Sequence, residues 1–75
     1  MAGKRREQRP GERVLSDLRA RIAADEWAVG EQLPPVARLA EQYGVSPGVI
    51  QRVEKRLAAD GLISVVAHWG VFRRG

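Results

Sequence analysis

The chain of 75 residues contains no cysteine and a single histidine. The absence of cysteine excludes disulfides, thiolate metal sites and thiol chemistry, and it fits a reducing cytosol. A zinc site would need carboxylates around His68 alone, so we expect no metal and no other cofactor. The longest strongly apolar stretch, residues 62–67, falls far short of the roughly 18 residues of a membrane span. Basic residues near the N-terminus have no apolar run behind them, which excludes a secretory signal.

Reactive side chains are too few for an enzyme. One histidine, no cysteine and scattered carboxylates provide neither a nucleophile–base pair nor a metal cluster. Asp25 and Glu26 are adjacent in sequence, and neighbouring residues on a helix do not face each other. We therefore predict that the protein is not an enzyme.

Positive charge is concentrated towards the ends of the chain. The formal net charge is +4, and residues 1–13 alone carry +3. We expect a flexible basic N-terminal arm over residues 1–11, which contains Arg5 and Arg6, followed by one domain over residues 12–75. A basic arm beside a small domain is typical of nucleic-acid binding, and the alternative is a solvated tail.

Apolar spacing predicts three helices, at about residues 11–25, 35–43 and 47–60. The first has a stripe of Val14, Leu15, Leu18 and Ile22, and Trp27 is expected to pack just after its end. Gly44 suits a left-handed end of the second helix. Ser46 followed by Pro47 is a strong start for the third, with the serine as the capping residue.

Two short apolar segments follow Gly61, and the turn His68-Trp69-Gly70 separates them. This pattern predicts a β-hairpin. Together the elements predict an α+β fold, a winged helix-turn-helix with three helices followed by a two-stranded β-hairpin wing. Trp69 either packs back on the core, which we favour, or is presented to a ligand, and Arg73 and Arg74 are expected to add cations beside the turn.

The spacing Gly44-Val45-Ser46 between two helices is typical of a helix-turn-helix. The outward face of the third helix gathers Gly48, Gln51, Arg52 and Lys55, where a generic solvated face is the alternative. Gln pairs with adenine and Arg with guanine or a phosphate, and base contacts concentrate at the start of a major-groove helix. The residues predicted here to contact DNA are Ser46, Pro47, Gly48, Gln51, Arg52, Lys55, His68, Trp69, Gly70, Arg5 and Arg6.

Over about residues 12–73 the sequence resembles the winged-helix DNA-binding domain of the GntR family of bacterial transcription regulators. The motifs that carry the resemblance are Gly30-Glu31-Gln32-Leu33-Pro34, Leu39-Ala40-Glu41-Gln42, Gly44-Val45-Ser46, Leu57-Ala58-Ala59-Asp60-Gly61-Leu62-Ile63 and Gly70-Val71-Phe72. The resemblance implies that the wing turn approaches the minor groove or the flanking backbone.

This sequence departs from the family pattern at two places. Ala37 stands where the family has an arginine that often touches DNA, so this contact is lost unless Arg38 replaces it. Pro47-Gly48-Val49-Ile50-Gln51 replaces Arg-Thr-Thr-Val-Arg after the Gly-Val-Ser motif, which alters the operator sequence and not the fold. Family members usually continue into an effector-sensing domain, and we expect no small-molecule effector site within this chain.

The first hypothesis is a sequence-specific transcription regulator that binds double-stranded DNA, as a homodimer on a two-fold operator, in the cytoplasm at the nucleoid and away from membranes. The alternative is a winged-helix protein-interaction module, or an architectural accessory of a plasmid or phage system. Salt dependence of binding to duplex DNA distinguishes the two hypotheses.

Overall fold

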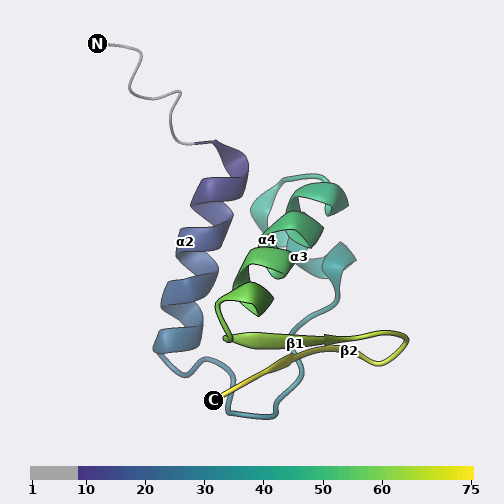
Figure 1. The fold of residues 1–75 in the computed structure, drawn as a ribbon. Coiled ribbons are helices and arrows are strands. Elements are labelled where there is room, and N and C mark those ends of the chain that lie inside the picture. The colour runs from purple at the N-terminus through teal and green to yellow at the C-terminus, as the bar shows by residue number, and fades with distance from the viewer. Residues whose placement is uncertain (1–8) are drawn as a thin grey trace.

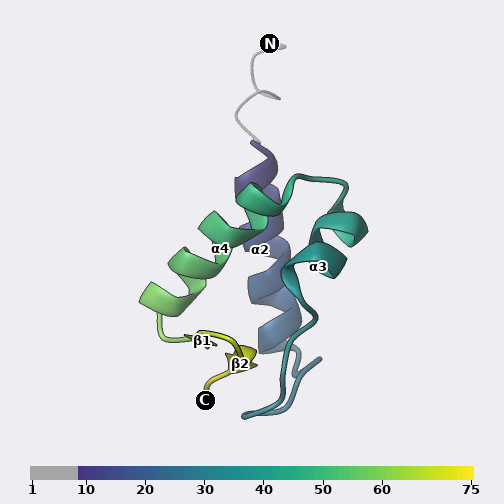
Figure 2. The ribbon, with the colours of Figure 1, turned by 90° about the vertical axis from the view of Figure 1, so that its right-hand side faces the viewer.

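The structure, a computed structural model, describes residues 9–75. Its elements are helix α2 (Pro10–Ala23), helix α3 (Val36–Tyr43), helix α4 (Pro47–Ala59), strand β1 (Ile63–Val66) and strand β2 (Gly70–Arg73). Figures 1 and 2 show α3 and α4 on the same side of α2, with the hairpin crossing below the helices. Three helices followed by an antiparallel hairpin confirm the predicted winged helix-turn-helix.

The helix boundaries differ slightly from the predicted ones. Helix α2 begins at Pro10, whose missing N–H suits the first helical position, so Pro10 and Gly11 are helical although the sequence placed them in the arm. It ends at Ala23, because Ala24 leaves the helical conformation and Asp25 has a φ of 60°. Residues 1–8, with Arg5 and Arg6, lie outside the described residues, so the predicted arm stays a prediction.

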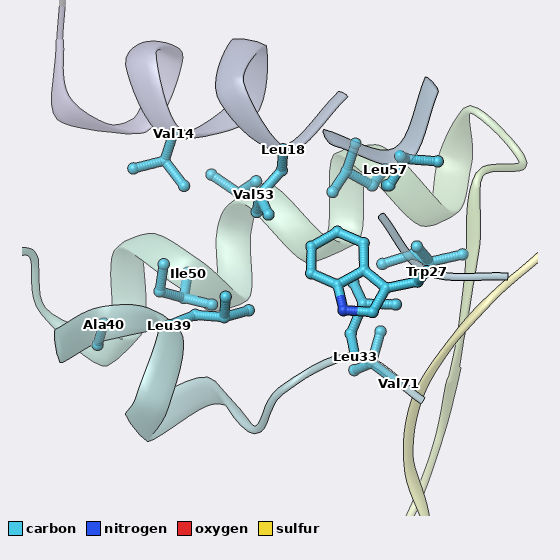
Figure 3. Close-up of a cluster of buried hydrophobic side chains, with 12 residues drawn as sticks. Val14, Leu18, Trp27, Leu33, Leu39, Ala40, Ile50, Val53, Leu57 and Val71 are labelled. Carbon is cyan, nitrogen blue, oxygen red and sulfur yellow. The ribbon is translucent and has the colours of Figure 1, made fainter. Parts of the chain in front are cut away.

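The core draws on every element and contains the predicted helix stripes (Figure 3). Its buried members are Val14, Leu18, Ile22, Trp27, Leu33, Leu39, Ala40, Ile50, Val53, Leu57, Ile63 and Val71. Trp27 packs just after α2, as predicted, and only 6% of its surface is exposed. Leu18 and Leu57 are completely buried, which places the interface of α2 with α4 at the centre of the core.

Glycines end two of the helices as predicted. Gly44 has a φ of 66° and caps α3 in the left-handed conformation, and Val45 N–H then donates to the Ala40 carbonyl at 3.0 Å. Gly61 follows α4 with a φ of 79°. Both reversals are therefore tight, and they bring α4 against α3 and β1 against the end of α4.

Strand β2 has a backbone partner on both sides, which the sequence did not reveal. It pairs with β1 in antiparallel register and also with the extended segment 30–33. Leu33 N–H donates to the Val71 carbonyl at 2.8 Å, and Arg73 N–H donates to the Glu31 carbonyl at 2.9 Å. The base of the wing is therefore fixed to the connection between α2 and α3.

Two arginines tie the end of α2 to the rest of the fold. Arg21 donates to the Glu26 carboxylate and to the Tyr43 hydroxyl, and its guanidinium lies 4.7 Å from the centre of the Trp27 ring. Arg73 donates to Asp25 Oδ1 at 2.6 Å and to the Trp27 carbonyl at 2.7 Å. The expectation that Arg73 adds a cation beside the wing turn is therefore wrong, because Arg73 lies at the opposite end of β2 and its guanidinium binds Asp25 and the Trp27 carbonyl.

We predict that Leu18→Ala destabilises the domain by about 3–5 kcal/mol, because the leucine is fully buried between helices and leaves a cavity. Leu15→Ala is the matched control on the same helix, since Leu15 is only half-buried and should cost less than half as much. Urea unfolding followed by tryptophan fluorescence measures both. Equal losses for the two variants would contradict the placement of the core.

Candidate nucleic-acid interface

Helix α4 begins at the predicted pair Ser46 and Pro47, with Ser46 at the capping position. Among the described residues, the Ser46 side-chain oxygen does not accept the hydrogen bond expected from a backbone N–H of the first turn. Both side chains are exposed. The start of α4 therefore carries the partial positive charge of a helix N-terminus without a capping oxygen, which favours an anion there.

The side of α4 opposite the core carries the predicted polar face. Gln51, Arg52 and Lys55 are exposed, while Ile50, Val53 and Leu57 are buried on the other side.

Gly48 opens space at the start of this face. A Cβ there would lie 4.0 Å from Nη1 of Arg52, so the Arg52 guanidinium folds back beside the first turn of the helix. This face is polar, positive and close to the backbone at the start of α4.

A shallow hollow, here called the wing hollow, lies between α4, the start of α3 and the hairpin. It measures about 810 Å³ and is lined by Gln32, Pro35, Val36, Gln51, Glu54, Lys55, Ala58 and residues 65–71. Five of the predicted residues meet around it, namely Gln51, Lys55, His68, Trp69 and Gly70. The structure therefore joins the outward face of α4 to the wing turn, as a continuous interface requires.

Arg52 lines a second hollow, between the start of α2 and α4. This arginine hollow is formed by Arg9, Pro10, Gly11, Glu12, Leu15, Val49, Arg52, Val53 and Arg56. Arg56 also forms an ion pair with Asp60 at 3.5 Å. The predicted residues of α4 thus divide between its two flanks, and Arg38, although exposed, lines neither hollow.

Trp69 does not pack on the core. Its side chain is at the wing turn with 74% of its surface exposed, so the favoured sequence interpretation, packing on the core, is wrong. The alternative, presentation to a ligand, stays a prediction. The adjacent His68 is exposed and has a φ of 68°. Strand β1 leaves the core at the buried Ile63 and is exposed by Val65 and Val66, so the turn that follows it lies outside the core.

Sequence reasoning missed Gln32 and Glu54. Gln32 Nε2 donates to the Trp69 carbonyl at 2.9 Å, and nothing in the local pattern signals this contact across the sheet. Glu54 is 5% exposed, and its Oε2 has no hydrogen-bond partner among residues 9–75. A signal for Glu54 was present, because it follows Ile50 by four residues and therefore falls in the inner stripe of α4.

Burial raises the pKa of the Glu54 carboxyl above its ordinary value, since the charged form loses hydration without gaining a partner. Within residues 9–75 no cluster of three or more His, Asp and Glu side chains is placed to hold a metal ion. Over the same residues, no helix combines the length and apolar character needed to cross a bilayer.

Comparison with known proteins identifies relatives of this arrangement. The family model described as bacterial regulatory proteins, gntR family, matches residues 10–72. A crystal structure of a GntR-family transcriptional regulator has 36% identity to this chain and a TM-score of 0.81. The match covers 92% of this chain but only 27% of that protein. No curated protein matches the chain.

Two further solved structures share the fold at lower identity. The N-terminal domain of AraR, in complex with a mutant ORR3, has 23% identity and a TM-score of 0.83, with 87% of this chain and 93% of that one covered. A GntR family transcriptional regulator from Listeria monocytogenes has 23% identity and a TM-score of 0.80, with 85% of this chain and 56% of that one covered.

We predict that Glu54→Leu stabilises the fold by about 1–3 kcal/mol at pH 7, because it removes a buried carboxylate without a partner. Between the ordinary and the raised pKa, the folded chain holds more protons than the unfolded chain. Stability of the wild type is therefore greatest below the ordinary pKa and falls as pH rises through the raised one.

Urea unfolding of both proteins from pH 4 to pH 7 measures this difference. The gain from Glu54→Leu should shrink towards pH 4. Glu41→Leu serves as the control, because Glu41 is exposed on α3 and its replacement should change stability by no more than about 0.5 kcal/mol. A Glu54→Leu protein less stable than the wild type at pH 7 would show that the carboxylate has a partner in the fold.

Proposed function

The chain belongs to the GntR family of bacterial regulatory proteins, and on this basis we propose that it is a sequence-specific DNA-binding transcription regulator. Helix α4 enters the major groove of double-stranded DNA, and the wing turn at residues 68–70 lies near the flanking backbone or minor groove. The observation that carries this proposal is the wing hollow, because it joins the polar face of α4 to the wing turn in one concave surface.

Charge and exposure support this orientation. The described residues that line the wing hollow include two charged side chains, Glu54 and Lys55. Because Glu54 is buried, Lys55 provides the exposed charge. Arg52 lies beside the start of α4, where the helix dipole adds positive potential. A phosphate backbone therefore meets favourable charge on both flanks of α4.

Each residue of the interface has a proposed role. Gln51 and Arg52 read base edges, and Lys55 contacts a phosphate. Ser46, Pro47 and Gly48 allow the start of α4 to approach the groove closely, and His68 and Gly70 contact the backbone from the wing. Arg38 adds a contact from α3, and Arg5 and Arg6, outside the described residues, bind phosphates along the flanking DNA.

We further propose that the protein acts as a homodimer on a two-fold operator, in the cytoplasm at the nucleoid. The similarity to a GntR-family transcriptional regulator of 36% identity supports the regulatory part of this role. The competing function is a protein-interaction module, which the exposed Val65, Val66 and Trp69 of the wing favour. Binding to duplex DNA at different salt concentrations separates the two.

We predict that the protein binds duplex DNA with strong salt dependence. If about five phosphates are neutralised per subunit, the logarithm of the association constant falls against the logarithm of salt concentration with a slope of about −4 to −5. Fluorescence polarisation with a labelled duplex from 50 to 200 mM salt measures the slope. A selection from a random duplex pool, performed alongside, should yield a two-fold motif, whereas a flat response to salt would favour the protein-interaction module.

We predict different effects for two cations of α4. Arg52→Ala should cost about 1–3 kcal/mol of binding and relax the preference at one base position, because Arg52 reads a base edge. Lys55→Ala should weaken binding to all sequences alike and reduce the salt slope by about 1. Arg19→Ala is the control of equal charge, since Arg19 lines neither hollow. Loss of base preference in Lys55→Ala alone would reverse the two assignments.

A further inference from the structure

The wing turn presents an apolar surface that the domain itself does not use. Trp69 is 74% exposed, and behind it on β1 the side chains of Val65 and Val66 are 56% and 42% exposed. Tryptophan is highly buried on average in folded proteins. In Figure 1 the turn between β1 and β2, which carries Trp69, projects beyond α3 and α4.

The backbone that carries this indole is held in place. Trp69 N–H donates to the Val66 carbonyl at 3.0 Å, and the Trp69 carbonyl accepts from Gln32 Nε2 at 2.9 Å. Gly70 has a φ of 126°, and a Cβ there would lie 2.2 Å from the same Gln32 nitrogen. Gln32 belongs to the segment that pairs with β2, so the sheet fixes the turn and leaves only the side-chain torsions of Trp69 to adjust.

The surroundings of the turn define the chemistry of its partner. Trp69 and Lys55 line the same wing hollow, and the buried Glu54 leaves Lys55 as the exposed charge of its described lining. An indole gains little from a phosphate, because its large apolar ring needs another flat or apolar surface. A partner with negative charge next to flat apolar faces is a nucleic acid, in which phosphates flank the stacked bases.

We propose that Trp69 is a wedge that inserts from the minor-groove side between two adjacent base pairs, and that Gln32 is the positioning residue that holds its backbone. Insertion partly unstacks the step and bends the duplex towards the major groove, which is occupied by α4. Pyrimidine–purine steps such as TA unstack most readily, so they are the preferred sites. This inference rests on the proposed DNA-binding function and adds a deformation of the DNA to it.

The test uses the full chain and a duplex selected from a random pool, with 2-aminopurine replacing adenine at one TA step per duplex, moved along the flank of the half-site. Fluorescence polarisation reports binding, and 2-aminopurine fluorescence reports unstacking in the same sample. Wild-type protein should raise the 2-aminopurine signal at one flanking step and lose the emission of Trp69 on binding. Trp27, the other tryptophan, is buried and should keep its emission.

Variants separate the wedge from general binding. Trp69→Ala should weaken binding about 10-fold and abolish the 2-aminopurine signal, while Trp69→Phe retains an aromatic ring and should lose no more than about 3-fold. Trp69→Ala should leave the salt slope unchanged, because the indole neutralises no phosphate. Gln32→Ala should reduce the 2-aminopurine signal with the indole still present. Val29→Ala is the control, since Val29 is 64% exposed and lies outside both hollows.

The outcomes are distinct. Failure of the wild type to bind any duplex overturns the proposed function and the wedge with it. Salt-dependent binding without an increase in 2-aminopurine fluorescence at any step, or with equal affinity in Trp69→Ala, overturns the wedge alone. If Trp69→Ala instead lowers the sedimentation mass of the free protein and leaves DNA binding unchanged, the wing turn is a protein contact and the wedge is rejected.

Discussion

Packing of one side of α4 against α2 and α3 fixes the geometry of the whole domain. Ile50, Val53 and Leu57 are buried in that contact, and their burial sets the rotation of the helix about its own axis. Because consecutive helical residues are 100° apart, this rotation also determines where Gln51, between two of them in sequence, must point. The polar face is therefore oriented by the hydrophobic effect acting on the opposite face.

The orientation of α4 also explains why the carboxylate of Glu54 is buried. Glu54 falls in the inner stripe of α4, where it is 5% exposed and borders the wing hollow beside the start of α3 and the hairpin. A carboxylate there is deprived of water and has no internal partner among residues 9–75. Its position lowers stability without any evident gain in packing, and no contact in the structure explains why a glutamate stands there.

Much of the fold could be predicted because its determinants are local. Stripes of apolar residues, Gly44 as a helix end and Pro47 as a helix start each depend on a few neighbours in sequence. The contacts that escaped prediction join residues far apart in the chain. Gln32 binds the Trp69 carbonyl, and Arg73 binds Asp25 in the connection that follows α2. No periodic pattern encodes such pairings.

For the candidate interface, the exposure of the polar face of α4 could be predicted, but the arrangement of its residues around the two hollows could not. The outward residues of α4 follow from helical periodicity, so Gln51, Arg52 and Lys55 were found. Their division between two hollows was not, because it depends on where α2 and the hairpin lie beside α4. The prediction that Trp69 packs on the core was wrong. Its apolar character suggested burial, whereas its position in the turn, at the end of β1 that lies away from the core, leaves it exposed.

Burial is lost along β1, from Ile63, which is fully buried, through the half-buried Ser64 to the exposed Val65 and Val66. The base of the wing thus belongs to the core, and its far end contributes almost nothing to folding. Shortening the side chains of the exposed Val65, Val66 or Trp69 should therefore change the free energy of unfolding far less than shortening Ile63. One short hairpin thus divides its residues between those that hold the fold together and those that are free to meet a partner.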